Sequence, residues 1–283
     1  MPDPDFTIKV DALLPPEIAQ RAEDIGTKKA SMSIEKVFVL AFLAGAFIAL
    51  GAVFATTIAT GGSALPYGIN RLITGLVFCL GLILVVVAGA ELFTGNNLII
   101  IAWAARKVST LLLLRNWAIV YVGNFVGSVA TALLIVATKQ YSFDGGAVGE
   151  TALNIADGKL QLDFIQAIAL GMMCNALVCL AVWLTFSART TVDKIAAIIF
   201  PISAFVAAGF EHSVANMYFI PVALFIKAFD SGYMESLGVE YADLTWSNFL
   251  VNNLLPVTIG NIIGGTLMVG AVYWFVYIRD SEG

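Results

Sequence analysis

Six long apolar segments restrict the fold of this chain more than any other feature of its sequence. Each is long enough to cross the hydrocarbon core of a bilayer, which takes about 20 residues of α-helix. The chain is 59% hydrophobic and 12% charged, against about 25% charged residues in a soluble domain. The sequence therefore predicts an all-α integral membrane protein with six transmembrane helices, at about 34–58, 69–104, 112–138, 162–186, 194–228 and 248–277.

The polar ends and loops predict how the helices are oriented. We expect a cytoplasmic N-terminal tail at 1–32, a channel domain at 33–278 and a cytoplasmic C-terminal tail at 279–283, with no cleavable signal peptide. Eleven Lys and Arg residues fall in the tails and the loops on their side, against four on the other side. The positive-inside rule then places both termini in the cytoplasm. The segments 139–160 and 229–246 are predicted to be polar loops.

The N-terminal tail contains one predicted helix. Pro15-Pro16-Glu17 begins it, apolar residues follow at helical spacing, and Gly26 follows the last of them. An amphipathic helix of this kind can lie on the membrane surface or act as a gate, and the sequence leaves both roles open.

Two of the apolar segments are interrupted by short polar stretches. The stretch 88–97 contains Glu91, and the stretch 207–216 contains Glu211 and the single histidine of the chain, His212. A carboxylate costs about 2.5–3.5 kcal/mol at the centre of a lipid-facing helix, so both should face protein or water. Irregular backbone at membrane depth is tolerated only where it lines a cavity or is buried in protein. We therefore expect helices 2 and 5 to be broken at mid-membrane around a transport site.

The two interruptions belong to an internal repeat. Gly89-x-Glu91 and Gly209-x-Glu211 are 120 positions apart, and a Gly-Asn-x-x-Gly motif occurs around Asn124 and again around Asn261. Because a repeat of three helices is odd, the second copy is predicted to be inverted, with repeats at about 33–139 and 160–278. The motif glycines are predicted to allow close helix packing, and the two asparagine amides need hydrogen-bond partners.

Each break predicts a place for a small anion. The half-helix that follows a break begins with its positive dipole end there, and helix N-termini attract anions. Thr94 and Ser213 are predicted to cap these starts. His212 adds a donor that can titrate near neutral pH, although it could instead be a structural imidazole bonded to Glu211 or Asn175.

The neighbouring carboxylates and apolar side chains have two possible roles each. Glu91 and Glu211 are predicted to brace their loops by accepting backbone N–H bonds, because a bare carboxylate in the path would repel anions. The large apolar residues beside the breaks could narrow the path or simply pack or face lipid; they are Phe78, Leu82, Leu92, Phe93, Phe205 and Phe210.

Other classes of function find less support in the sequence. Cys79, Cys174 and Cys179 lie in apolar segments without a Cys-x-x-Cys unit, so no metal, cofactor or disulfide framework is expected. A membrane enzyme is disfavoured for two reasons. His212 and Ser213 are adjacent in sequence, which is a poor arrangement for a base and a nucleophile, and no Gly-x-Ser-x-Gly elbow is present. A water or glycerol channel would be expected to carry Asn-Pro-Ala, and a scaffold would leave the two buried carboxylates unexplained. No basic patch indicates nucleic acid.

These motifs resemble the formate/nitrite transporter family over nearly the whole chain. The Gly-Ala-Glu-Leu-Phe-Thr break, the Asn175 segment, the Gly-Phe-Glu-His-Ser-Val-Ala-Asn break and Pro-Val-Thr-Ile-Gly-Asn-Ile-Ile-Gly-Gly near the C-terminus carry the resemblance. It implies an aquaporin-like protomer with its own pore in a homopentamer of the inner membrane. It also implies passage of formate, nitrite or hydrosulfide. Formate is the expected substrate, although Glu91 stands where many formate-type members have Asp.

The resemblance also implies roles for single residues. Thr94 and His212 would form the central site with Asn175 beside the histidine, and Asn261 matches the asparagine of the last helix. Leu82 and Leu92 would form the cytoplasmic slit, and Phe78 and Phe205 the periplasmic one. The two pore mouths would carry Lys29 and Lys159.

Overall fold

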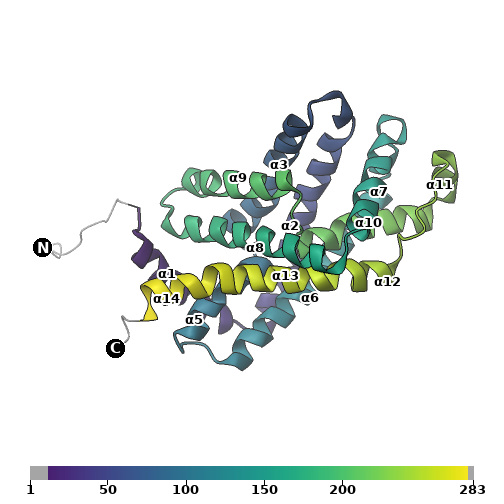
Figure 1. The fold of residues 1–283 in the computed structure, drawn as a ribbon. Helices are drawn as coiled ribbons and strands as arrows, with labels where there is room; N and C mark the ends of the chain where they lie inside the picture. Colours follow the sequence, from purple (N-terminus) through teal and green to yellow (C-terminus); the bar gives the residue numbers. More distant parts are fainter. Residues whose placement is uncertain (1–11, 280–283) are drawn as a thin grey trace, which may run out of the picture.

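The computed structural model describes residues 12–279, and these residues form a bundle of helices (Figure 1). The long helices are joined by short helical turns, and π-helical residues Leu84–Gly89 continue α3. The π-helical segments Phe249–Leu254 and Gly264–Gly270 join α12, α13 and α14 into one rod. The elements are α1 (Pro15–Ala30), α2 (Ile34–Ala59), α3 (Tyr67–Ile83), α4 (Phe93–Asn96), α5 (Ile100–Ala104), α6 (Thr110–Ala137), α7 (Ala147–Leu160), α8 (Phe164–Ser187), α9 (Thr191–Ala208), α10 (Ser213–Phe229), α11 (Ser231–Leu237), α12 (Trp246–Asn248), α13 (Leu255–Ile263) and α14 (Ala271–Tyr277).

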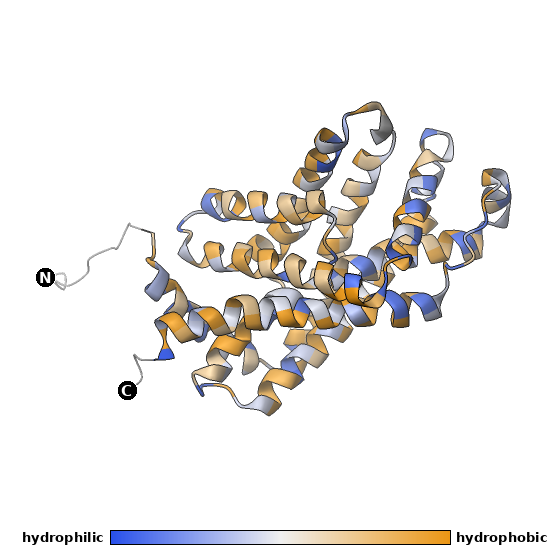
Figure 2. Cartoon of the chain, in the orientation of Figure 1, coloured by the Kyte–Doolittle hydropathy of each residue, from blue (hydrophilic) through white to orange (hydrophobic). Residues whose placement is uncertain are grey.

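Six helices of the described chain are long and apolar enough to cross a membrane, as predicted. They are α2, Tyr67–Gly89, α6, α8, α9 and Asn248–Tyr277. Large apolar side chains cover their outer surfaces, including Leu111 and Phe200, which are 77% and 80% exposed. Hydrophilic residues gather towards the helix ends and around α7 and α11 (Figure 2). Such a surface needs lipid or another apolar partner, because water would not stabilise it.

The two predicted breaks lie where the sequence placed them. Helical backbone stops at Gly89, whose φ of 87° suits glycine, and resumes at Phe93. In the second half α9 stops at Ala208, Gly209 has a φ of 76°, and α10 begins at Ser213. A left-handed residue ends a helix without a steric penalty only when it lacks a Cβ.

The segment 139–160 is not a loop, and this prediction was wrong. Its second half forms α7, whose buried face contacts α10. Figure 1 shows α7 and α11 at the opposite end of the molecule from α1 and α14. The apolar residues of this segment are short and are mixed with Gly and Asp, so the sequence did not indicate a helix. The stability of α7 comes from packing rather than from helix propensity.

Close backbone contacts explain the motif glycines. A Cβ on Gly127 would overlap the carbonyl oxygen of Phe42, and a Cβ on Gly264 would overlap that of Met172. The pair α2–α6, and α8 with the π-helical segment Gly264–Gly270 after α13, therefore approach through glycine faces. This agrees with the packing role predicted for these residues.

Candidate functional site

Two asparagines hold the broken helices in matching ways. Asn124 accepts a bond from Phe93 N at 2.8 Å and donates to the carbonyl oxygens of Ala41 and Glu91 at 2.8 and 2.9 Å. Asn261 accepts from Ser213 N at 2.9 Å and donates to Gly171 O and Glu211 O, both at 2.9 Å. Both amides are fully buried. Asn261 therefore braces the second break, and its amide has the hydrogen-bond partners that the sequence required.

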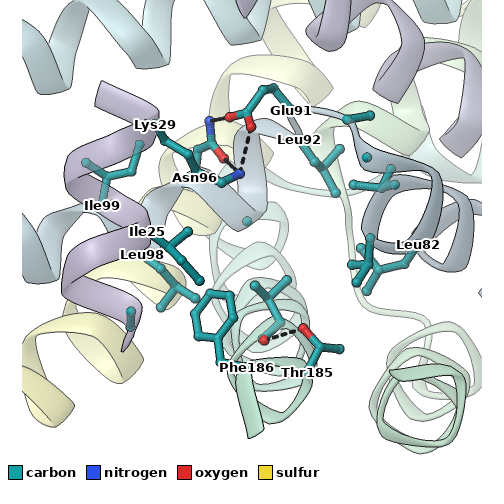
Figure 3. A pocket seen from close by; sticks show the side chains of 18 of the residues that line it. Ile25, Lys29, Leu82, Glu91, Leu92, Asn96, Leu98, Ile99, Thr185 and Phe186 are labelled. Atoms are coloured by element: carbon teal, nitrogen blue, oxygen red, sulfur yellow. Dashed lines mark hydrogen bonds and ion pairs between the residues drawn. The ribbon is translucent and has the colours of Figure 1, made fainter. Parts of the chain in front are cut away.

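The two carboxylates are each held by a lysine and an asparagine. Lys29 Nζ lies 3.0 Å from Glu91 Oε1, and Asn96 Nδ2 donates to Glu91 Oε2 at 2.7 Å (Figure 3). Lys159 Nζ lies 2.7 Å from Glu211 Oε1, and Asn216 Nδ2 donates to Glu211 Oε2 at 2.6 Å. The carboxylates thus brace their loops through side chains, whereas backbone N–H donors were predicted.

Four asparagines were missed by the sequence analysis. Asn96 Nδ2 also donates to Asn116 Oδ1, and Asn116 Nδ2 donates to the carbonyl of Lys29. Asn216, Asn253 and Lys159 repeat this arrangement in the second half. A signal for two of the four was present, because Asn96 and Asn216 each follow a buried glutamate by five positions.

His212 joins the two breaks. Its Nε2 lies 2.9 Å from Thr94 Oγ1, and its Nδ1 accepts a bond from Ala215 N at 3.0 Å. His212 is therefore the N-cap of α10, and Leu92, at the start of α4, provides no side-chain cap. The caps predicted for Thr94 and Ser213 were wrong. The alternative bonds from His212 to Glu211 or Asn175 are not formed either.

The cap fixes the tautomer of the imidazole. Because Nδ1 accepts an N–H, the neutral ring carries its proton on Nε2 and donates it to Thr94 Oγ1. The Thr94 hydroxyl then has its own hydrogen left to donate. This hydroxyl hydrogen, oriented by the imidazole, can serve an acceptor such as a small anion.

Asn175 of α8 binds the main chain and another asparagine near Thr94. Its Nδ2 donates to Asn97 Oδ1 and to Asn261 O at 2.7 Å, and makes a longer contact of 3.3 Å with Thr94 O. Cys179 Sγ also contacts Thr94 O, at 3.3 Å. Asn175 therefore helps to fix the backbone that carries the threonine, and its position beside His212 stays a prediction.

Three cavities lie in series along the molecule. The first vestibule has a volume of about 330 Å³ and is lined by Lys29, Glu91, Leu82 and Leu92 (Figure 3). The second vestibule, of about 370 Å³, is lined among others by Phe78, Phe205, His212, Lys159 and Glu211.

Between the vestibules lies a central chamber of about 10 Å³, close to the lower limit for one water molecule. Phe78, Leu82, Leu92, Phe205 and His212 all line it. Four of the six apolar residues that could narrow the path therefore surround the chamber, whereas Phe210 lines the second vestibule. Phe93 does not belong with them, because its ring packs edge-to-face on Trp117 and Tyr121 of α6.

The repeat is broken at the two residues that meet in the centre. A shift of 120 positions relates Glu91 to Glu211, but it relates Leu92 to His212 and Thr94 to Val214. The bracing residues are therefore duplicated, while each polar residue of the central contact has an apolar equivalent.

Apolar membrane-length helices around two vestibules and a buried polar contact define a multi-pass membrane protein of the channel and transporter class. The family model described as formate/nitrite transporter matches residues 16–275, and the chain belongs to this family. It is 43% identical over 276 residues to the formate channel FocA of Escherichia coli K12, covering 96% of this chain and 97% of that protein.

Further relatives agree with this assignment. The chain is 42% identical over 263 residues to the formate channel FocA of Haemophilus influenzae, covering 92% and 93% of the two chains. A solved pentameric formate channel with formate bound superposes with a TM-score of 0.82 at 48% identity, covering 87% of this chain and 98% of that one. An FNT family ion channel gives a TM-score of 0.77 at 29% identity, over 92% and 98%.

Proposed function

We propose that this protein is a channel for formate and not an enzyme. The observation that carries the proposal is the contact of His212 with Thr94, which stands between the two vestibules. The relatives named above as formate channels support formate over nitrite or hydrosulfide. We infer a homopentamer in the inner membrane, with both termini in the cytoplasm by the positive-inside rule.

The electrostatics suit a small anion that must bind and leave. Lys29 and Lys159 attract anions towards the centre, but Glu91 and Glu211 neutralise them at 3.0 and 2.7 Å. At the centre the anion meets only the dipoles of Thr94 and His212 and the positive end of α10. Binding is then strong enough for entry and weak enough for release.

The apolar residues around the central chamber favour a neutral form during passage. A bare carboxylate pays a large desolvation cost between Phe78, Leu82, Leu92 and Phe205. A proton given by a His212 imidazolium to a formate oxygen would produce formic acid, which crosses more readily. That imidazolium would carry hydrogen on Nδ1, so it must first give up the bond from Ala215 N. Proton transfer is therefore coupled to release of the α10 cap.

The helix α1 is the proposed gate of the first vestibule. Lys29, in its last turn, bonds to Glu91 and to Asn96 Oδ1 at 2.9 Å. Removal of residues 1–28 would take away most of α1, the helix that holds Lys29 against Glu91. A protein lacking residues 1–28 should show an altered response of formate flux to low pH, and an unchanged response would dismiss the gate.

The function is tested in liposomes that contain the purified protein. Flux of formate, nitrite, hydrosulfide and glycerol is measured across a pH series, beside the variant His212→Asn. Formate flux that rises with acidity and depends on His212 is expected. Glycerol flux alone, or no anion flux, contradicts the proposed function. Full formate flux with normal pH dependence in His212→Asn removes only the proton-transfer step.

A further inference from the structure

The second vestibule contains a cation that the first vestibule lacks. Arg71 of α3 lines it together with Lys159. The Nε of Arg71 donates to Ala207 O at 3.2 Å, and its Nη2 donates to Val206 O. Both acceptors belong to the last turn of α9, so this guanidinium covers the negative dipole end of that helix.

The vestibules differ in charge because of this residue. In the first, Lys29 is balanced by Glu91. In the second, Glu211 balances Lys159, and the only partners of Arg71 among residues 12–279 are uncharged carbonyl oxygens. Two cations and one carboxylate leave one net positive charge in the second vestibule, counting the histidine as neutral.

Arg71 also has N–H donors that do not bond to α9. A guanidinium has five N–H groups in a planar fork that matches a carboxylate. Two of them bond to α9, and the side chain is only half-buried. Thr74 and Phe78 follow on the same face of α3 and line the same cavity. At 1.5 Å per residue, Arg71 is about 10 Å along the helix from the constriction at Phe78.

We propose that Arg71 forms an outer binding site for a small carboxylate, two helical turns outside the Phe78–Phe205 constriction. The anion binds there before it reaches His212, and the first vestibule has no equivalent site. The shift of 120 positions relates Arg71 to Thr191, which does not line the first vestibule. This proposal rests on the proposed function, because it takes formate as the carboxylate.

The test compares entry of formate from the two faces of the membrane. Initial uptake of labelled formate is measured in right-side-out spheroplasts and in inside-out vesicles from cells that make Arg71→Gln, Arg71→Lys or the wild-type protein. A half-exposed charge contact changes affinity by about fivefold. Arg71→Gln should raise the half-saturating formate concentration about fivefold in spheroplasts and leave it within about twofold in inside-out vesicles. Arg71→Lys, which keeps the charge, should stay near the wild type on both faces.

Lys139→Gln is the matched control, because it removes a cation predicted to lie on the same face without lining a cavity. It should leave both half-saturating concentrations unchanged. Equal effects of Arg71→Gln on the two faces, or none, overturn the outer site and leave Arg71 as a clamp on α9. Absence of formate uptake by the wild type instead overturns the proposed function.

If Arg71→Gln does not reach the membrane, the proposal can be tested on the wild-type protein by varying the ionic strength. Raising the ionic strength from about 0.01 to 0.1 M with impermeant ions shortens the Debye length about threefold. This should raise the half-saturating concentration more in spheroplasts than in inside-out vesicles. An equal response on both faces overturns the proposal.

Discussion

Replacing Thr94 by valine tests the central contact with little change in shape. The backbone should accept valine, since Val214 occupies the equivalent position of the second break. The substitution removes the hydroxyl that lies 2.9 Å from His212 Nε2. His212 is only 3% exposed, so its N–H gains no water in exchange.

The expected loss follows from one hydrogen bond to an anion. Such a bond to a charged group is worth about 1.5–3 kcal/mol, which corresponds to a loss of about 10- to 150-fold in formate flux at low substrate concentration. The unpaired N–H of His212 should also lower the free energy of unfolding by about 1–3 kcal/mol. Stopped-flow uptake into liposomes measures the flux, and thermal melting in detergent measures the stability.

Thr94→Ser is the control, because it keeps the hydroxyl and loses only a methyl group. It should retain most of the flux. Flux within about twofold of wild type in Thr94→Val would refute the reasoning, since a hydrogen bond that contributes to binding cannot be worth so little. A loss of equal size in both variants would show that shape matters and the hydroxyl does not.

Three further changes test the support around the site. Glu211→Gln leaves Lys159 without a charged partner and should lower both the melting temperature and the formate flux. Breaking a fully buried ion pair costs roughly 3–5 kcal/mol of stability. The loss should be smaller here, because the lysine side chain is 16% exposed. Gly264→Ala forces a methyl group against a main-chain carbonyl of α8 and should cost about 1–3 kcal/mol in a denaturation series; unchanged stability would disprove the close approach. The Tyr141 hydroxyl donates to Asp230 and holds the pKa of that carboxyl below its ordinary value. The stability that the ionised Asp230 contributes is present above its unfolded-state pKa and is lost as the pH falls through its lowered folded-state pKa. Asp230→Asn should therefore flatten the acid side of a plot of melting temperature against pH. An unaltered plot would count against the bond.

The long apolar segments and their internal repeat predicted much of the fold. Apolar length gave the six membrane helices, because every spanning helix must satisfy its backbone internally and show apolar side chains to lipid. The two glutamates located both breaks, since a carboxylate in such a run has few tolerable positions. Their repeated spacing also indicated that the chain consists of two related halves.

Single contacts at the site were harder to predict. The resemblance implied Asn175 beside His212 and matched Asn261 with the asparagine of the last helix, but it did not indicate that both amides donate to backbone carbonyl oxygens. For Phe93 the sequence left open whether the ring narrows the path or packs, and the structure shows that it packs on α6. An amide or an aromatic ring beside a helix break satisfies the same sequence pattern whether it faces the cavity or the packed interior. Only the neighbouring helices decide which way it points.

The sequence by itself determined that this chain spans a membrane, that helices 2 and 5 are interrupted around buried carboxylates, and that it resembles one transporter family. Tertiary structure decided which residues share the centre. Thr94 and His212 are 118 positions apart and meet only because the two broken helices converge. The lysines of α1 and α7 likewise reach Glu91 and Glu211 across the fold. Hydropathy is a property of each segment alone, whereas a hydrogen bond depends on where two distant segments are placed.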